Sequence, residues 1–237
     1  PVAEPLIGPP TIGIVTGSGP EAGIDLWQKV LAATRRQMGE RYRGDIDAPR
    51  VVIVSEPALG ASMDLPATDA EVGAALEATA ADVAARCDVY AIACNTLNVY
   101  ADRLRDRAGP ADLVAFPDVL LDWAEANSIR RLGLLGARPV TALGEWSPYT
   151  ALADQVELVT PADPDPLHRL IEAIKRDGGI DPGHHGALAA IVEGLGVATV
   201  ALACTELPLV ARPVPGTELV DVTELVATAL VSRVVAT

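Results

Sequence analysis

Two of the three cysteines in the sequence follow apolar runs. Cys94 directly follows the run at residues 89–93, and Cys204 directly follows the run at residues 198–203. In each case a strand would end and a helix would begin, and the positive end of a helix lowers the pKa of a nearby thiol. A thiolate can remove a proton from carbon and a thiol can return one. Two such cysteines that face each other could therefore invert a stereocentre by two-base proton transfer.

Other cysteine chemistry has less support in the sequence. Disulfide exchange favours a CxxC motif at a helix start, which the sequence lacks. Nucleophilic catalysis commonly pairs a cysteine with a histidine, and His168, His184 and His185 are all distant from both motifs along the chain, so such a pair stays open only through proximity in space. Cys87 precedes its apolar run and is expected to be a small core residue.

The elements around the cysteines predict an α/β fold. Residues 11–16 form a short apolar run that ends in the glycine-rich turn at residues 17–20, and helical spacing follows. The same order recurs with the apolar run at residues 50–54, the alanine-rich stretch at residues 70–86 and the run at residues 89–93. Continuous apolar strands separated by helices predict a parallel sheet covered on both faces, with ligands bound beyond the carboxyl ends of the strands.

The second part of the chain repeats this pattern. Residues 132–136 (LGLLG) resemble residues 12–16 (IGIVT), and the two cysteine runs resemble each other. We therefore predict two pseudosymmetric open parallel-sheet α/β domains with the active site in the cleft between them. The expected domains are residues 11–116 and 117–212, and residues 213–237, which include an apolar run with helical spacing, are expected to pack back on the first domain or across a dimer interface.

Composition excludes several classes of partner. The chain has 18 Lys and Arg against 32 Asp and Glu, a net charge of −14, so it would repel nucleic acid and anionic membranes. Aromatic residues make up only 3 % of the sequence, too few for base-stacking platforms. Three cysteines argue against a disulfide framework and for a reducing, cytoplasmic compartment. Neither a signal peptide nor a transmembrane helix is predicted, and residues 1–10, with four prolines, are expected to be disordered or extended.

Four segments together resemble a known family. They are residues 13–22 (GIVTGSGPEA), 93–96 (ACNT), 132–136 (LGLLG) and 204–209 (CTELPL), and they occur in order. The set resembles the aspartate/glutamate racemase superfamily, most closely its aspartate racemase branch. The resemblance implies a cofactor-independent amino-acid racemase, commonly a homodimer, that uses Cys94 and Cys204 as its acid/base pair and needs neither pyridoxal phosphate nor a metal.

Residues next to the cysteines are candidates for substrate binding. Asn95 and Thr96 follow Cys94, and Thr205 and Glu206 follow Cys204. Their backbone N–H groups and hydroxyls could bind a substrate carboxylate and the enolate-like charge that grows when the proton leaves. Ordinary helix capping is the alternative role for such residues.

The glycine-rich turn and a lysine complete the expected site. The resemblance implies that Gly17, Ser18 and Gly19 line the pocket and that Lys175 holds a substrate carboxylate. Ser55, after the second predicted strand, is also expected to bind substrate. The turn also resembles a dinucleotide-binding GxGxxG motif, but the nearest suitable acidic residue, Glu56, lies too far along the chain.

Two departures from the family pattern concern the substrate. Ser62 stands where aspartate racemases typically carry an arginine for the side-chain carboxylate, and Asn98 replaces a family histidine. We therefore expect a less acidic amino acid or a related carboxylate as substrate. A related isomerase or decarboxylase that uses one thiol, or a two-lobed small-molecule binding protein, is the alternative. His184 and His185 are expected on an exposed helix start, and no metal site is predicted.

Overall fold

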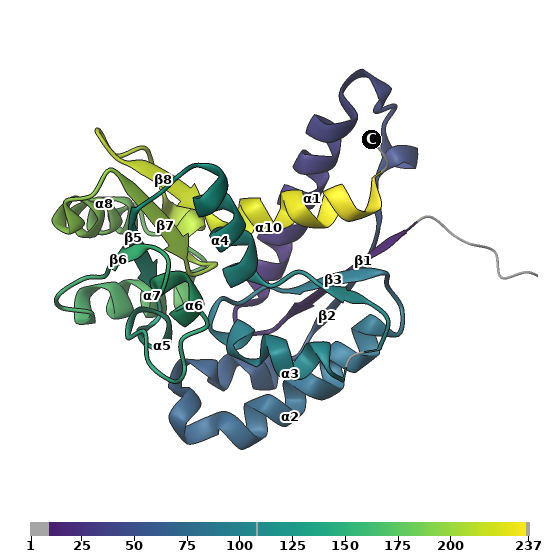
Figure 1. Cartoon of the computed structure of the whole chain (residues 1–237), viewed down its shortest axis with the longest axis horizontal. Coiled ribbons are helices and arrows are strands. Elements are labelled where there is room, and N and C mark those ends of the chain that lie inside the picture. Colours follow the sequence, from purple (N-terminus) through teal and green to yellow (C-terminus); the bar gives the residue numbers. More distant parts are fainter. Residues whose placement is uncertain (1–9, 108, 236–237) are drawn as a thin grey trace, which may run out of the picture.

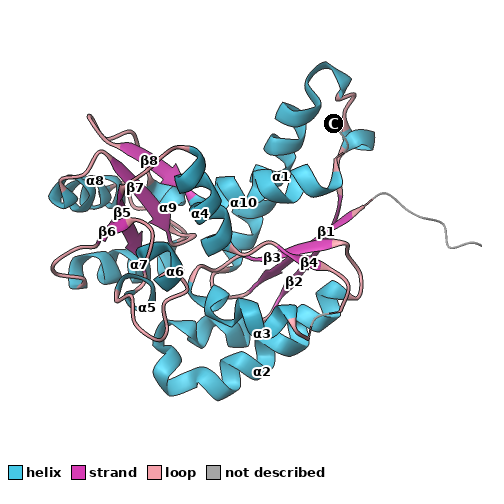
Figure 2. Ribbon diagram, in the orientation of Figure 1, coloured by secondary structure: helices cyan, strands magenta, loops and turns pink. Residues whose placement is uncertain are grey.

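The strands of the computed structural model, which describes residues 10–107 and 109–235, form two four-stranded parallel sheets (Figure 2). The first sheet has the order β2-β1-β3-β4 and the second β6-β5-β7-β8, so both have the same topology. The strands are β1 (Thr11–Thr16), β2 (Arg50–Ser55), β3 (Val89–Ile92), β4 (Asp112–Leu113), β5 (Arg131–Gly136), β6 (Glu157–Val159), β7 (Thr199–Ala203) and β8 (Glu218–Asp221). The predicted fold class is confirmed. The extended segment expected at residues 1–10 lies, except for Pro10, outside the described residues.

The central strands are buried on both faces, which explains their continuous apolar sequences. Every residue of β1, β3 and β7 is buried. Gly13 of β1 and Gly133 of β5 hold equivalent places in the two sheets. A Cβ atom at Gly13 would lie 2.4 Å from Val83 Cγ1, and one at Gly133 would lie 2.8 Å from Val200 Cγ2, so both positions need a glycine for close packing.

Helices cover both faces of the first sheet (Figure 1). Helices α1 (Pro20–Met38), α4 (Phe116–Ala126) and α10 (Val222–Val234) share one buried cluster, and α2 (Leu65–Ala84) and α3 (Ala101–Arg105) lie on the opposite face. The last helix, α10, packs along α1 and against α4. Residues from the C-terminal part of the chain thus complete the first sheet's helix layer. The domain boundaries given above stay predictions.

Shorter helices surround the second sheet. They are α5 (Arg138–Thr141), α6 (Thr150–Ala153), α7 (Asp165–Asp177), α8 (Gly183–Leu195) and α9 (Leu207–Val210). The connections also contain 3₁₀ segments at Gly39–Arg41, Asp45–Asp47, Pro57–Asp64 and Thr96–Tyr100. Among the described residues, no helix combines the length and the apolar character that a membrane span requires.

One hydrophobic core is common to the two sheets. Ile14 of the first sheet and Leu134 of the second belong to the same buried cluster as α1, α4 and α10. The next residue in each strand points to the opposite face, and Val15 and Leu135 therefore belong to two separate outer clusters, one with α2 and α3 and the other with α7 and α8. The shared core fixes the two sheets relative to each other, and with them the loops at their carboxyl ends.

Candidate active site

A small cavity lies where loops from the carboxyl ends of both sheets meet. Cys94 follows β3 and Cys204 follows β7, and both thiols line this space, which we call the thiol cavity. Its volume is about 10 Å³, close to the least that one water molecule needs, so its walls must move apart to admit a substrate. The expected site residues that line it are Ser18, Cys94, Asn95, Thr96, Lys175, Cys204, Thr205 and Glu206. Ser62, Met63, Ala137 and Ala203 complete its walls.

Three of the expected substrate-binding residues do not line the thiol cavity. Gly19 packs against its wall, because a Cβ atom there would lie 2.3 Å from Glu206 Oε1 and 3.3 Å from Lys175 Nζ. Gly17 turns the chain at the end of β1 with a φ of 132° and approaches the backbone of Glu56. Ser55 is exposed at the end of β2 and is not part of the cavity wall.

The tight approach at Gly17 supports a stability prediction. A Cβ atom at this position would lie 2.0 Å from Glu56 O, and its φ of 132° is unfavourable for any L-side chain. We expect Gly17→Ala to lower the free energy of unfolding by about 3 kcal/mol, from overpacking and backbone strain. Urea unfolding would measure it. Gly186→Ala, in α8 with nothing within 4 Å of the added atom, is the matched control and should be neutral or stabilising. Equal stability of the two variants would contradict the argument.

A charged network surrounds Cys204. Lys175 Nζ donates to Glu206 Oε1 over 2.6 Å and to the Ser18 carbonyl oxygen over 3.2 Å. The other carboxylate oxygen of Glu206 accepts hydrogen bonds from Cys204 Sγ at 3.0 Å and from Thr205 Oγ1 at 3.2 Å. Only 4 % of Glu206 is exposed, so this carboxylate is held by its partners and hardly by solvent. The sequence placed Glu206 in the site but did not reveal that its side chain joins the lysine to the thiol.

The surroundings of Cys204 shift its pKa in the direction opposite to the one expected. We expected a helix start to lower the thiol pKa, but burial, followed by the neighbouring Glu206 carboxylate, raises the pKa of Cys204 well above its ordinary value. The following helix, α9, has only four residues and offers a weak dipole. Burial would lower the pKa of Lys175, but the Glu206 carboxylate, with its hydrogen bond to Lys175, and the nearby Cys204 and Cys94 sulfurs outweigh it, so the pKa of Lys175 is raised. Cys204 is therefore a protonated thiol and Lys175 a cation near neutral pH.

Tyr149 is a site residue that the sequence analysis missed. It is fully buried, lies in the segment before α6, and its hydroxyl donates to Asn95 Oδ1. Burial, followed by the nearby Cys204 and Cys94 sulfurs, raises its pKa well above the usual value, so the hydroxyl keeps its proton. The other amide atom, Asn95 Nδ2, is buried and has no hydrogen-bond partner among the described residues. No local pattern links these two residues, which are 54 positions apart.

Ser62 and Asn98, the two departures from the family pattern, have clear structural roles. Ser62 lines the thiol cavity, and its hydroxyl lies 2.7 Å from the hydroxyl of Ser18. Asn98 Nδ2 donates to the Cys94 carbonyl oxygen over 2.8 Å, and its Oδ1 accepts a hydrogen bond from the backbone N–H of Phe116 over 3.0 Å. Asn98 therefore holds the loop that carries Cys94.

The histidines lie away from the thiol cavity. The expectation that His184 and His185 are exposed is wrong, because His184 is buried with Nε2 2.8 Å from Asp177 Oδ2, and His185 is half-buried. His185 Nδ1 lies 2.5 Å from the Val210 carbonyl oxygen. His168 lines a larger cleft described below. Within residues 10–107 and 109–235, the thiol cavity thus has no histidine in its walls.

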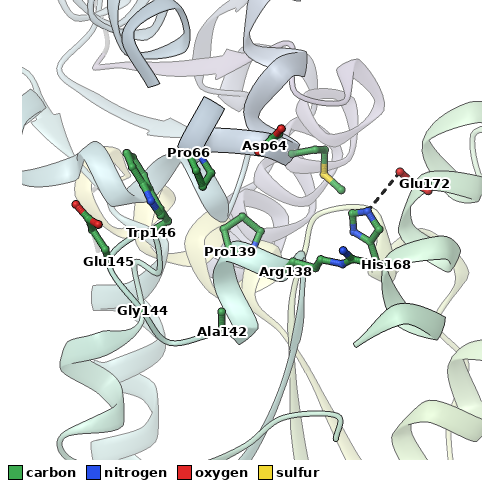
Figure 3. A pocket seen from close by; sticks show the side chains of 11 residues that line it. Asp64, Pro66, Arg138, Pro139, Ala142, Gly144, Glu145, Trp146, His168 and Glu172 are labelled. Atoms are coloured by element: carbon green, nitrogen blue, oxygen red, sulfur yellow. Dashed lines mark ion pairs between the residues drawn. The ribbon is translucent and has the colours of Figure 1, made fainter. Parts of the chain in front are cut away.

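A larger opening, which we call the outer cleft, adjoins the thiol cavity. Its volume is about 560 Å³, and Met63 lines both spaces. Figure 3 shows its walls, which come from the end of the 3₁₀ segment Pro57–Asp64, the start of α2, α5, the segment after α5, and α7. The lining residues are Met63, Asp64, Pro66, Arg138, Pro139, Ala142, Gly144, Glu145, Trp146, His168 and Glu172.

Comparison with known proteins places this geometry in a wider context. A family described as Asp/Glu/Hydantoin racemase matches residues 15–230. The structure is similar to aspartate racemase from Picrophilus torridus, with a TM-score of 0.79 and 20 % identity over 95 % of this chain and 94 % of that one. It is also similar to an aspartate racemase homologue from Pyrococcus horikoshii, with a TM-score of 0.71 and 22 % identity over 94 % and 98 % of the two chains.

Glutamate racemase from Campylobacter jejuni has a TM-score of 0.64 and 15 % identity over 94 % of this chain and 85 % of that one. At such identities the structural likeness shows a common fold. No protein with curated function matches the sequence.

Proposed function

The chain belongs to the Asp/Glu/Hydantoin racemase family, and from this premise we propose that Cys94 and Cys204 form its acid/base pair. It is accordingly an isomerase, and amino-acid racemisation is the general activity that family membership supports. The observation that carries the proposal is that both thiols, one from each sheet, line a single buried cavity.

The proposed reaction moves one proton off the α-carbon and another onto its opposite face. The thiolate of one cysteine takes the α-proton, and the electrons of the broken C–H bond delocalise into the substrate carboxylate as an enolate-like charge. The thiol of the other cysteine then donates its proton to the opposite face, and its sulfur becomes the thiolate. The product is the other enantiomer, and the two cysteines have exchanged protonation states.

Neighbouring groups support these steps. Glu206 accepts a hydrogen bond from the Cys204 thiol, and it is placed to take the proton when Cys204 must act as the base. The unpartnered Asn95 Nδ2, together with Thr96 and Thr205 in the cavity wall, can donate to the carboxylate as its negative charge grows. Lys175 supplies the positive charge of the site. No step is assigned to a cofactor.

We propose a substrate without a side-chain carboxylate. Ser62 offers a hydroxyl where the family arginine would offer a bidentate cation. The lysine that lines the thiol cavity and the arginine that lines the outer cleft already have partners, Lys175 with Glu206 and Arg138 with Asp165 at 2.7 Å. A second carboxylate would therefore meet no free cation among the residues that line the thiol cavity and the outer cleft.

Incubation with L-amino acids in deuterated water tests this function. Chiral chromatography should show the D-enantiomer, and mass spectrometry should show deuterium at the α-carbon. A pure binding protein would show neither change. Turnover confined to aspartate would contradict the proposed substrate, although it would leave the racemase chemistry intact.

The thiol pKa predicts the pH dependence. Because burial and Glu206 raise the pKa of Cys204, protonation of the working thiolate should limit the rate at low pH. We expect kcat/KM to rise from about pH 6 and to keep rising above about pH 8.5, the ordinary thiol pKa, because the Cys204 pKa lies higher than that. Lys175, whose pKa is raised, keeps its charge over this range. Initial rates on folded enzyme would measure the profile, and a profile that is flat down to about pH 5 would rule out a rate-limiting thiolate.

We also propose a homodimer in a reducing, cytoplasmic setting. The three cysteines are free, in keeping with that setting. Ile24 and Trp27 expose 54 % and 42 % of their surface on one side of α1, and Ile53 exposes 38 % on the edge strand β2. Light scattering should give the mass of a dimer, and Trp27→Asp should shift it toward the monomer. Ile180 is 84 % exposed and lies on neither α1 nor β2, so Ile180→Asp should leave the mass unchanged.

A further inference from the structure

We propose that the outer cleft receives the substrate's side chain, and that this side chain has an apolar stem and a cationic end, an amine or a guanidinium. This inference rests on the proposed racemase function and adds the substrate class to it.

The position of the outer cleft makes it a side-chain site. The thiol cavity, at about 10 Å³, must hold the α-carbon between the two sulfurs and has no space for a long side chain. Met63 forms part of the wall of both spaces, and Ser62 and Ala137 of the thiol cavity directly precede Met63 and Arg138 of the cleft. A methionine side chain is flexible enough to move aside. A substrate side chain directed past Met63 enters about 560 Å³ of space.

The walls of the cleft suit an apolar stem. Met63, Pro66, Pro139 and Trp146 contribute thioether, ring and indole surface. Figure 3 shows Pro66, Pro139 and Trp146 on neighbouring sides of the opening. Methylene groups of a long side chain would leave water for this surface.

The charges around the cleft favour a cationic group at the end of the substrate's side chain. Asp64, Glu145 and Glu172 bring three carboxylates, against one guanidinium from Arg138, so the acidic and arginine side chains leave a net formal charge of −2. Arg138 is already 2.7 Å from Asp165 Oδ1. Glu172 lies 3.4 Å from His168 Nε2 and is half-exposed, and Asp64 is exposed. A cation gains from this field, whereas a second carboxylate is repelled by it.

A panel of matched amino acids tests the inference. With the full-length enzyme in deuterated water, α-deuterium exchange should be at least tenfold faster in kcat/KM for L-lysine and L-arginine than for L-norleucine, which has the stem but no charge. L-glutamate should be slower than all three. Added salt should reduce the advantage of the basic substrates, because salt screens charges at an exposed rim.

Charge-removing variants provide the second arm. The double change Asp64→Asn and Glu172→Gln should raise KM for L-lysine about tenfold and leave KM for L-norleucine unchanged. Glu193→Gln, on an exposed part of α8, changes the net charge without touching the cleft and should leave both KM values as they are. L-norleucine or L-glutamate exchanging as well as L-lysine would overturn the substrate class but not the racemase function. Absence of exchange with every amino acid would overturn the proposed function, and this inference with it.

We also infer, from a different observation, that Tyr149 is a positioning residue for the Asn95 amide. Asn95 is 2 % exposed and lines the thiol cavity, and its Nδ2 has no partner among the described residues. Such a buried donor is rare unless a ligand completes it. Because the Tyr149 hydroxyl donates to Asn95 Oδ1, the amide is held with Nδ2 as its free donor. Tyr149 follows a strand of the second sheet and Asn95 one of the first, so this bond also links the two.

Removal of one hydroxyl tests this role. Tyr149→Phe should lower kcat about tenfold with little change in KM, and it should increase the isotope effect of an α-deuterated substrate on kcat. The double variant Asn95→Ala and Tyr149→Phe should have a kcat only slightly lower than that of Asn95→Ala alone. Tyr100→Phe, which removes a hydroxyl 2.8 Å from Asp69 Oδ1 outside the cavity, controls for the loss of a tyrosine hydrogen bond, here a partly buried one, and should leave kcat unchanged. Independent, additive effects of the two changes on kcat would overturn the inference.

Discussion

Replacing Cys94 or Cys204 with serine is expected to slow racemisation by about 10²- to 10⁴-fold, the usual contribution of a positioned acid or base. A serine hydroxyl is far less acidic than a thiol, so it neither forms the base nor returns the proton at a useful rate. Both sulfurs are buried in one cavity, with exposures of 8 % for Cys94 and 6 % for Cys204, so solvent has little access to replace them.

The two cysteine variants should also differ in which enantiomer still exchanges its α-proton. With Cys94 left as the only base, one enantiomer can still exchange its α-proton for deuterium without inversion, and with Cys204 left, the other enantiomer can. Exchange followed separately for each enantiomer would measure this asymmetry. Cys87→Ser, at a cysteine that precedes β3 and lies outside the cavity, is the control and should retain full turnover. Loss of exchange with the same enantiomer in both variants would contradict the two-base mechanism.

Changing Glu206 to glutamine should have the second largest effect, a fall in kcat of about 100-fold, within the range for a group that assists proton transfer. Glutamine keeps the shape of the side chain but cannot take the Cys204 proton, and it no longer balances the charge on Lys175. The free energy of unfolding should fall by about 2 kcal/mol, as expected when a hydrogen bond between charged groups is lost in a largely buried place.

Steady-state kinetics and urea unfolding would separate the two effects of Glu206→Gln. Adding Lys175→Met removes the unbalanced cation, so it should restore part of the stability but none of the rate. Glu224→Gln breaks the surface pair with Arg36, where the side chains are 34 % and 56 % exposed, and should alter stability by less than about 1 kcal/mol with no effect on kcat. A rate unchanged by Glu206→Gln would show that Cys204 loses its proton by another route.

Local pattern was sufficient to predict the sheets and the position of the thiols. Strands β1 and β7 are short, continuous apolar runs, and a buried parallel strand requires such a run. The carboxyl ends of parallel strands carry the ligand-binding loops, so the residues after each apolar run could be assigned to one site. Cys94, Cys204 and their polar neighbours therefore line the same cavity.

The rest depends on packing between segments that are distant in the sequence. Tyr149 reaches Asn95 because the segment before α6 packs into the core that the two sheets share. The sequence around either residue does not predict this contact. His184 was expected to be exposed from its place at the start of α8, but Asp177 of the preceding helix covers it. The sign of the Cys204 pKa shift was missed because burial, which a sequence does not display, outweighs a helix of four residues.

The placement of α10 on α1 bears on how the protein emerges from the ribosome. Leu26 and Val30 of α1 are synthesised early, yet they share their buried cluster with Val226 and Leu230 of α10. During translation the hydrophobic face of α1 therefore stays exposed to solvent until all four strands of the second sheet have been synthesised. The two similar halves are thus unequal as folding units: the earlier one is finished only by a segment encoded after the later one, and a nascent chain stalled before residue 222 would be prone to associate with others.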